Sequence, residues 1–277
     1  MNRKAALIAA VAAVVATANV ANGTDQHRIE CASPTELTQL SRPLKRVAER
    51  LSRNEQITIL AIGSSSTEGY GASGAEFTYP SRLAVEMKTL LPKADIRVLN
   101  RGVGGEDARE MLARLDREMT EAKPDLVLWQ VGTNALLHEQ GVGPQASLIR
   151  TGLRRIHESG ADAVLIDPQY APKVLRDPDA KPMVALLARV ADETGIPIFR
   201  RFALMQFWHE QRNIAFADIL SPDLFHMNDW SYGCFATSLA GALTKASLPV
   251  ASDTDKTAVR VPATPESNSV TPISTRR

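Results

Sequence analysis

Short apolar runs alternate with helix-like segments along most of this chain of 277 residues. The runs are rich in β-branched residues, as buried strands are, and the segments between them place apolar residues at intervals of three and four. Such alternation predicts βαβ units and a parallel sheet covered by helices on both faces. The expected strands are 57–62, 96–99, 126–131, 163–166 and 196–199, and the expected helices are 33–51, 79–91, 106–119, 148–158, 183–194, 202–211 and 230–245.

Three of the expected strands end in turns that carry polar or glycine residues. The first strand leads into the serines 64–66, the second into Asn100–Gly105, and the third into Gly132–Asn134. The carboxyl ends of parallel strands lie along one edge of a sheet, where open α/β folds bind their ligands. Taken alone, a serine-rich turn is more typical of a helix cap than of a catalytic site. A late segment, Asp223–His226, adds a carboxylate and an imidazole three residues apart.

These four segments contain what acyl transfer requires: a nucleophile, a base with an orienting carboxylate, and hydrogen-bond donors for an oxyanion. They resemble the four motif blocks of the SGNH hydrolases, also called the GDSL family. The resemblance covers about residues 57–245. It implies a flavodoxin-like three-layer α/β/α sandwich with a five-stranded parallel sheet.

The resemblance also implies a role for each matching residue. Ser65 stands at the nucleophile position, His226 at that of the general base, and Asp223 at that of the residue that orients the imidazole. The backbone N–H groups of Ser65 and Gly105 and the side-chain amide of Asn134 would bind the oxyanion. No metal or cofactor is expected.

The sequence departs from the family pattern at two positions. Ser64 stands where the family has the aspartate before the nucleophile, and Ala135 stands where an acidic residue often follows the asparagine. Neither change removes a catalytic group. We expect Ser64, His138 and Gln169 to be candidates for substrate contact, because each lies close to a motif or to the catalytic edge. The sequence favours the alternatives for two of them, a hydrogen bond within the turn for Ser64 and a solvated loop position for His138. For Gln169, a proline-containing turn at 167–170 explains the sequence equally well.

The resemblance favours an exported serine esterase that removes short acyl or O-acetyl groups from carbohydrate. A lysophospholipase, a thioesterase or an arylesterase is the alternative among hydrolases. An O-acetyltransferase would use the same triad with a sugar hydroxyl as acceptor in place of water. A carbohydrate-binding module with an inactive site is the third class, disfavoured because all five motif residues are present.

Other residues offer rival interpretations that the spacing disfavours. His209 is the rival base, but its acidic neighbour Glu210 is adjacent on an expected helix, where neighbouring residues do not face each other. The segment Gly102–Gly105 follows a strand as a dinucleotide loop does, yet Asp107 occupies the place of the third glycine. The sequence has no Gly-x-Ser-x-Gly elbow of the α/β-hydrolases and no His-Glu-x-x-His zinc motif.

Charge and composition exclude some partners. The formal net charge is +1 and only 5% of residues are aromatic. Binding to nucleic acid needs a basic surface or a platform of aromatic residues. We therefore expect no nucleic acid as partner, whereas the resemblance to SGNH hydrolases implies a small-molecule or polysaccharide ester as substrate.

The N-terminus has the pattern of a secretory signal. Arg3 and Lys4 precede the apolar run 5–15, which is too short to span a bilayer, and small residues follow as at a cleavage site. We expect a signal peptide at 1–21, a periplasmic or secreted protein, and no stable membrane insertion after cleavage. An uncleaved anchor is the alternative.

The remaining boundaries follow from composition and from the helical pattern. Residues 22–54 are expected to form an arm and helix, 55–249 the hydrolase domain, and 250–277 a disordered tail rich in Thr, Ser and Pro. Cys31 and Cys234 would pair in an oxidising compartment, or would be two unrelated buried thiols, and the sequence leaves both open.

Overall fold

The computed structural model describes residues 30–248. The chain divides into two compact units, residues 1–31 and 32–277, and all described strands and helices lie in the second. The expected signal peptide at 1–21 and tail at 250–277 lie outside the described residues. Cys31 and Cys234 are each disulfide-bonded.

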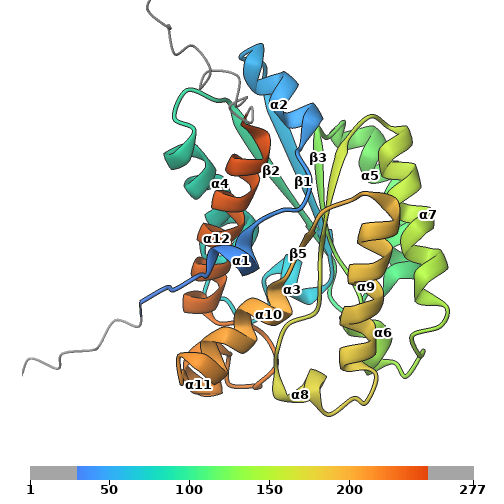
Figure 1. Cartoon of the computed structure of the whole chain (residues 1–277), viewed down its shortest axis with the longest axis vertical. Helices are drawn as coiled ribbons and strands as arrows, with labels where there is room; N and C mark the ends of the chain where they lie inside the picture. Colours follow the sequence, from blue (N-terminus) through green and yellow to red (C-terminus); the bar gives the residue numbers. More distant parts are fainter. Residues whose placement is uncertain (1–29, 249–277) are drawn as a thin grey trace, which may run out of the picture. The chain divides into compact units, whose positions relative to one another are not determined.

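A five-stranded parallel sheet forms the centre of the second unit, with the strand order β2-β1-β3-β4-β5 (Figure 1). This is the flavodoxin-like order, so the predicted fold is confirmed. The chain leaves β1 for one neighbour and later returns to the other side of β1. The carboxyl end of β1 is therefore the switch point where such sheets bind ligands. The strands are β1 (Ile57–Gly63), β2 (Ile96–Gly102), β3 (Leu126–Gln130), β4 (Asp162–Ile166) and β5 (Ile198–Phe199).

Helices cover both faces of the sheet, as the alternating pattern predicts (Figure 1). One face carries α2 (Lys45–Ser52), α4 (Tyr79–Leu90) and α12 (Asp229–Ser247). The other carries α5 (Ala108–Ala122), α7 (Gln145–Glu158) and α9 (Ala180–Thr194). Short helices follow the carboxyl ends of the strands: α3 (Ser65–Glu68) after β1, α6 (Thr133–Leu137) after β3, α8 (Pro172–Leu175) after β4 and α10 (Arg201–Gln206) after β5.

The core lies between the sheet and these helices. Every residue of β1 and β3 is buried, which explains why both strands read as continuous apolar runs. Trp129 in β3 is fully buried against α7, where a Cβ on Gly152 would come within 2.3 Å of the indole ring. A glycine in α7 thus allows the helix to approach the largest side chain of the sheet.

The predicted single helix at 33–51 is wrong. The structure has two helices there, α1 (Thr35–Thr38) and α2, joined by an extended segment. Pro43 lies in that segment, lacks an N–H and disfavours helical geometry at the residue before it. The apolar spacing continues through the break, because Leu44, which directly precedes α2, is buried like Val47 within α2.

The predicted helix at 202–211 is α-helical only in its first part. α10 ends at Gln206, and the turn Phe207–Gln211 is π-helical. Four short helices were not predicted, since four or five residues are too few to show a periodicity. They are α3, α6, α8 and α11 (Phe216–Ile219), and the 3₁₀ turn Ala75–Phe77 was also missed.

Candidate active site

The turn that leads from β1 into α3 carries Ser65 and packs closely against the carboxyl ends of β1 and β2. A Cβ on Gly63 would lie 2.1 Å from Thr67 Oγ1, and one on Gly102 would lie 2.0 Å from the backbone nitrogen of Glu68. Both glycines therefore let α3 sit directly against the strand ends. Ser65 is the first residue of α3 and remains partly exposed at this edge.

A continuous hydrogen-bonded relay connects Ser65 with the late loop between α11 and α12. Ser65 Oγ lies 2.8 Å from His226 Nε2, and His226 Nδ1 lies 2.6 Å from Asp223 Oδ2. The structure thus brings together the three residues that the sequence proposed as a triad, although the serine and histidine are 161 positions apart.

The Asp223–His226 loop is fixed by its own hydrogen bonds. Asp223 Oδ1 accepts bonds from Ser221 Oγ at 2.6 Å and from the backbone N–H groups of Phe225 and His226 at 3.0 Å each. Leu224 has a positive φ of 53°, which turns the chain between the carboxylate and the imidazole. The three-residue spacing therefore places both groups on one tight turn.

The electrostatics of the relay suit a neutral base beside an ionised carboxylate. Partial burial opposes the ionisation of Asp223, but the bonds from Ser221 and His226 outweigh it and hold the pKa of Asp223 well below its usual range. Burial lowers the pKa of His226 and outweighs the attraction of Asp223. A neutral His226 that donates from Nδ1 to Asp223 leaves Nε2 free to accept the Ser65 proton.

Two aromatic rings contact the imidazole. The rings of Tyr70 and Phe225 have centroids 4.4 Å and 4.3 Å from that of His226. The backbone of Tyr70 is fixed in turn, because its carbonyl accepts a 2.8 Å bond from the buried Tyr232 hydroxyl. These contacts restrict the ring to the orientation that reaches Ser65.

The other two motif turns lie beside the serine. Asn134 is in the first turn of α6, and its Nδ2 donates to the carbonyl of Glu106 at 2.8 Å. Asn100 joins the second turn to α3: its Nδ2 donates to the Glu68 carbonyl at 3.2 Å and its Oδ1 accepts from Gly102 N at 2.9 Å. The three strand ends therefore meet as predicted.

Gly105 is needed for its backbone conformation. Its φ is +84°, which disfavours any residue with a side chain, whereas a Cβ there would meet nothing within 4 Å. Neither Gly105 N–H nor Ser65 N–H donates a hydrogen bond to any group within residues 30–248. Both donors are thus available to an oxyanion.

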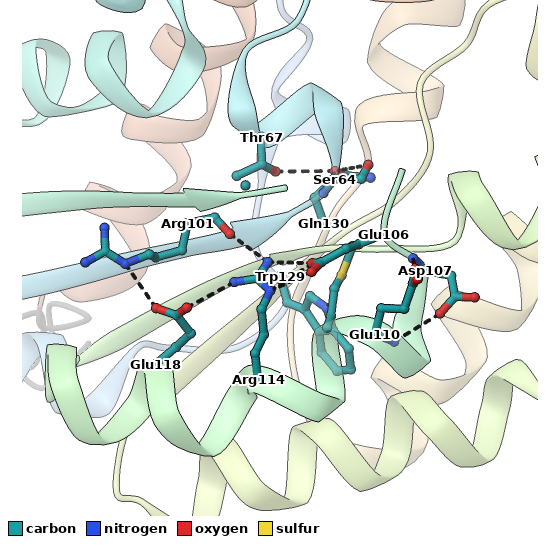
Figure 2. A network of polar contacts seen from close by, with 12 residues as sticks. Ser64, Thr67, Arg101, Glu106, Asp107, Glu110, Arg114, Glu118, Trp129 and Gln130 are labelled. Carbon is teal, nitrogen blue, oxygen red and sulfur yellow. Dashed lines mark hydrogen bonds and ion pairs between the residues drawn. The ribbon is translucent and has the colours of Figure 1, made fainter. Parts of the chain in front are cut away.

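Gln130 is a supporting residue that sequence reasoning missed. Its Oε1 accepts bonds from the Ser64 N–H at 3.0 Å, from Ser64 Oγ at 3.1 Å and from Thr67 Oγ1 at 3.3 Å (Figure 2). The side chain is buried at the end of β3. A polar residue that closes an otherwise apolar strand at the catalytic edge was the only sequence feature that pointed to it.

Two of the residues expected to contact substrate are buried instead. Ser64 is 2% exposed and bonds to Gln130, and Gln169 is fully buried. Gln169 Oε1 accepts from Thr133 Oγ1 at 3.1 Å and from Arg201 Nη2 at 3.0 Å. Both side chains are buried and bonded to other residues of the protein, so their burial disfavours the expected contact with substrate.

The third such residue, His138, ends α6 one turn beyond Asn134 and is exposed. Its contact with a substrate stays a prediction. The rival base His209 is engaged elsewhere: its Nδ1 lies 2.9 Å from the Ile214 carbonyl and its ring stacks on Phe216 at 3.7 Å. His226, and not His209, is the imidazole hydrogen-bonded to Ser65.

Residues 30–248 offer neither a cluster of metal ligands nor a membrane-spanning helix. No group of three or more His, Cys, Asp or Glu side chains in this range is arranged to hold a metal ion. No helix in the same range has both the length and the apolar character that crossing a membrane requires.

The family model described as the Non-GDSL lipase-like family matches residues 30–248, which is most of the chain. The chain belongs to the Non-GDSL lipase-like family. That description fits Ser64, which replaces the aspartate of the Gly-Asp-Ser pattern. The resemblance to SGNH hydrolases that the four motifs predicted is thereby confirmed.

Several of the proteins similar to this chain are esterases. An acetylxylan esterase of Geobacillus stearothermophilus is 32% identical over 78 residues, which are 28% of this chain and 36% of the esterase. This Non-GDSL lipase-like chain thus aligns with about a third of the length of that relative.

Two solved structures share the fold of this Non-GDSL lipase-like protein. One is a two-domain esterase active on acetylated mannans, with a TM-score of 0.64, 19% identity, and coverage of 82% of this chain and 60% of that one. The other is an acetyl xylan esterase from Geobacillus stearothermophilus, with a TM-score of 0.58, 19% identity, and coverage of 68% and 94%.

Proposed function

We propose that the protein is a serine esterase that hydrolyses carboxylic esters through an acyl-enzyme. The observation that carries the proposal is the unbroken relay from Ser65 through His226 to Asp223, at the edge where Asn134 and Gly105 present hydrogen-bond donors. A serine hydroxyl is a weak nucleophile at neutral pH and needs such a base. Membership of a lipase-like family supports the same reaction class.

In the first half of the reaction, Ser65 Oγ attacks the ester carbonyl as its proton passes to His226 Nε2. Asp223 accepts the Nδ1 proton in a hydrogen bond and stabilises the imidazolium that forms. The negative charge on the carbonyl oxygen would be met by the N–H groups of Ser65 and Gly105 and by the amide of Asn134. The tetrahedral intermediate then collapses, and His226 returns the proton to the departing alcohol.

In the second half, water takes the place of the alcohol. His226 Nε2 removes a proton from the water, the resulting hydroxide attacks the acyl carbonyl, and the same donors bind the second oxyanion. The acid leaves when Ser65 Oγ recovers its proton from His226. The chain's own residues therefore account for every proton transfer in the cycle.

We further propose that the substrate is an O-acetylated carbohydrate. The named relatives act on acetylated xylan or mannan. A hollow of about 520 Å³ lies between the turn after Asn134 and the segment around α8, and its wall mixes charged and apolar side chains, as sugar hydroxyls and ring faces require. Its lining includes Leu136, Glu139, Lys173, Arg176, Asp177 and Asp179.

The hollow is linked to the candidate site through residues next to Asn134 and His226. Its first lining residues follow Asn134 directly, and Lys173 stands over the Phe225 ring at 5.0 Å, which itself contacts His226. We propose that the sugar part of an ester held at Ser65 lies there.

A polysaccharide substrate is found outside the cytoplasm, so we propose that the mature protein is periplasmic or secreted. N-terminal sequencing of exported protein tests whether the expected signal peptide is removed, and an intact Met1 would contradict its removal.

A substrate series tests the proposed function. Release of acid is measured from nitrophenyl esters of increasing acyl length and from acetylated xylo- and manno-oligosaccharides, with Ser65→Ala as the control. We expect acetyl esters to be cleaved faster than octanoyl esters, acetate to be released from the oligosaccharides, and the control to be inactive.

Three outcomes would contradict the proposal. If Ser65→Ala turned over the esters as fast as wild type, Ser65 would not be the nucleophile. A preference for long acyl chains would point to lipid esters as substrates. Transfer of acetyl to an added sugar in preference to water indicates an acetyltransferase, which uses the same triad.

The pH profile follows from the lowered pKa of His226. Only the neutral imidazole accepts the serine proton, so kcat/KM for p-nitrophenyl acetate should rise with pH and reach a plateau by neutral pH. Because burial depresses the pKa, the midpoint should lie below about 6.5, the ordinary value for histidine. An acid limb with a midpoint above neutrality would contradict the assignment of His226 as the base.

A further inference from the structure

Arg114, in the second turn of α5, reaches back to the loop that carries Gly105. Its guanidinium binds both oxygens of the Glu106 carboxylate, with Nε 3.0 Å from Oε1 and 2.8 Å from Oε2, and Nη2 2.7 Å from Oε2. Nη2 also donates to the Arg101 carbonyl at 2.8 Å. One side chain thus holds both ends of residues 101–106, hereafter the oxyanion loop (Figure 2).

The pair is shielded from solvent. The Arg114 and Glu106 side chains are 10% and 15% exposed. Bidentate Arg–carboxylate bonds are stronger and more directional than single ones, and removal of solvent reduces screening. This pair therefore fixes the position of Glu106 more firmly than an exposed ion pair would.

Glu118 extends the network on the opposite side of Arg114. It is 7% exposed and accepts from Arg101 Nε at 3.0 Å and from Arg114 Nη1 at 3.4 Å (Figure 2). It also accepts from Arg117 Nη2 at 3.2 Å. Glu118 is buried on α5, whereas its neighbour Met119 is half-exposed. A buried carboxylate with three arginine partners is tolerated because its charge is compensated.

Glu106 connects this network to the oxyanion donors. Its carboxylate is held by Arg114, while its carbonyl accepts the 2.8 Å bond from Asn134 Nδ2. An amide nitrogen has two N–H bonds, so the second remains for an oxyanion. Gly105 directly precedes Glu106 and has no side chain to anchor it.

The oxyanion loop is held at its start, where residues 101 and 102 pair with β1 and the Val103 N–H donates to the Gly63 carbonyl at 3.0 Å. Beyond Val103 it has few backbone bonds: Glu106 N lies 3.4 Å from the Val103 carbonyl, which is a long hydrogen bond, and Gly105 N has no partner within residues 30–248. The position of the Gly105 donor consequently depends on what holds Glu106, whose carbonyl also accepts the bond from Asn134.

We propose that Arg114 is a positioning residue that preorganises the oxyanion donors through Glu106. The inference rests on the proposed esterase function and adds a residue that touches no substrate. Displacement of a donor by about 1 Å is enough to cost roughly a hundredfold in rate. Loss of the Arg114 bonds should therefore lower kcat and leave KM nearly unchanged, because the donors act on charge that develops in the transition state.

The test compares Arg114→Met with Arg114→Lys and with Arg117→Met. Arg117 is the matched control: it pairs with the same Glu118 from the same helix, is 64% exposed and makes no hydrogen bond or ion pair to the oxyanion loop among residues 30–248. We expect Arg114→Met to lower kcat for p-nitrophenyl acetate roughly ten- to a hundredfold with KM within about twofold. Arg114→Lys should restore part of kcat, since lysine keeps the charge without the bidentate geometry.

Hydrogen exchange provides a readout that does not need activity. The amides of Val103, Glu106 and Asp107 should exchange faster in Arg114→Met than in wild type, and should be unchanged in Arg117→Met. Equal exchange and equal kcat in the two variants would overturn the proposal. An inactive wild type would refute the esterase function alone, and the exchange data would still decide whether Arg114 holds the loop.

A variant that retains side-chain size covers the case in which Arg114→Met fails to fold. Glu106→Gln keeps one acceptor oxygen and the backbone carbonyl, yet loses the charge that Arg114 binds. A smaller loss of kcat in the same direction, with faster exchange of the same amides, supports the proposal. Wild-type kcat and exchange in Glu106→Gln would overturn it.

Discussion

Replacement of Ser65 by alanine should lower kcat for p-nitrophenyl acetate by a factor on the order of 10⁴ to 10⁶, and His226→Ala should cost about as much. Each change breaks the 2.8 Å contact between Oγ and Nε2 through which the proton passes. Because the two residues act as one unit, the double variant should be no slower than either single variant. Initial rates for all three proteins measure this.

Two histidine controls separate loss of the base from general damage. His157 is exposed on α7, and His209 is the rival base, bonded to the Ile214 carbonyl. His157→Ala and His209→Ala should keep kcat within about twofold of wild type, as surface changes away from a site usually do. A hundredfold loss in His209→Ala with full activity in His226→Ala would reverse the assignment.

Asn134→Ala should lower kcat by about 10² to 10³, or roughly 3–4 kcal/mol of transition-state stabilisation. The amide would act only on the oxyanion, so KM should change little. The substitution also removes the 2.8 Å bond to the Glu106 carbonyl, which adds to the effect. Steady-state kinetics with the purified variant test both parameters.

Asn134→Asp is the matched variant, because it keeps the shape and replaces two donors by a negative charge. It should be at least as slow as Asn134→Ala, since a carboxylate repels the oxyanion. A variant with wild-type kcat at either substitution would show that the amide does not stabilise the transition state.

The fold and the meeting of Ser65, His226 and Asp223 could be predicted because both leave local patterns. The buried strands read as apolar runs, and the serine, glycine and asparagine turns follow three of them in order. Parallel pairing then brings those turns to one edge. The Asp223–His226 spacing is short enough for a single turn, so the sequence also indicated which carboxylate orients the imidazole.

The supporting residues could not be predicted, because their partners are remote in sequence. Arg114 has the position of a half-exposed residue on an amphipathic helix, and nothing in its spacing indicates that Glu106 folds back onto it. Gln169 and Arg201 are fully buried polar residues, and only tertiary contacts reveal that they bond to each other beneath Thr133. The spacing of apolar residues indicates which side of a helix or strand faces the core, but it does not indicate which partners the polar side chains contact.

The prediction of a single helix at 33–51 was wrong for a related reason. Its apolar residues kept a helical spacing although Pro43 separates two elements, and burial of Leu44 required no helix. A proline inside a periodic segment was the stronger indication.

The most direct test of the account is covalent trapping of the nucleophile. The protein is treated with a fluorophosphonate, and the labelled residue is identified by mass spectrometry of its peptides. The account predicts one adduct per chain, on Ser65, slowed strongly in His226→Ala and absent in Ser65→Ala. An adduct on Ser64 or Ser66, or equal labelling of Ser65→Ala, would contradict it.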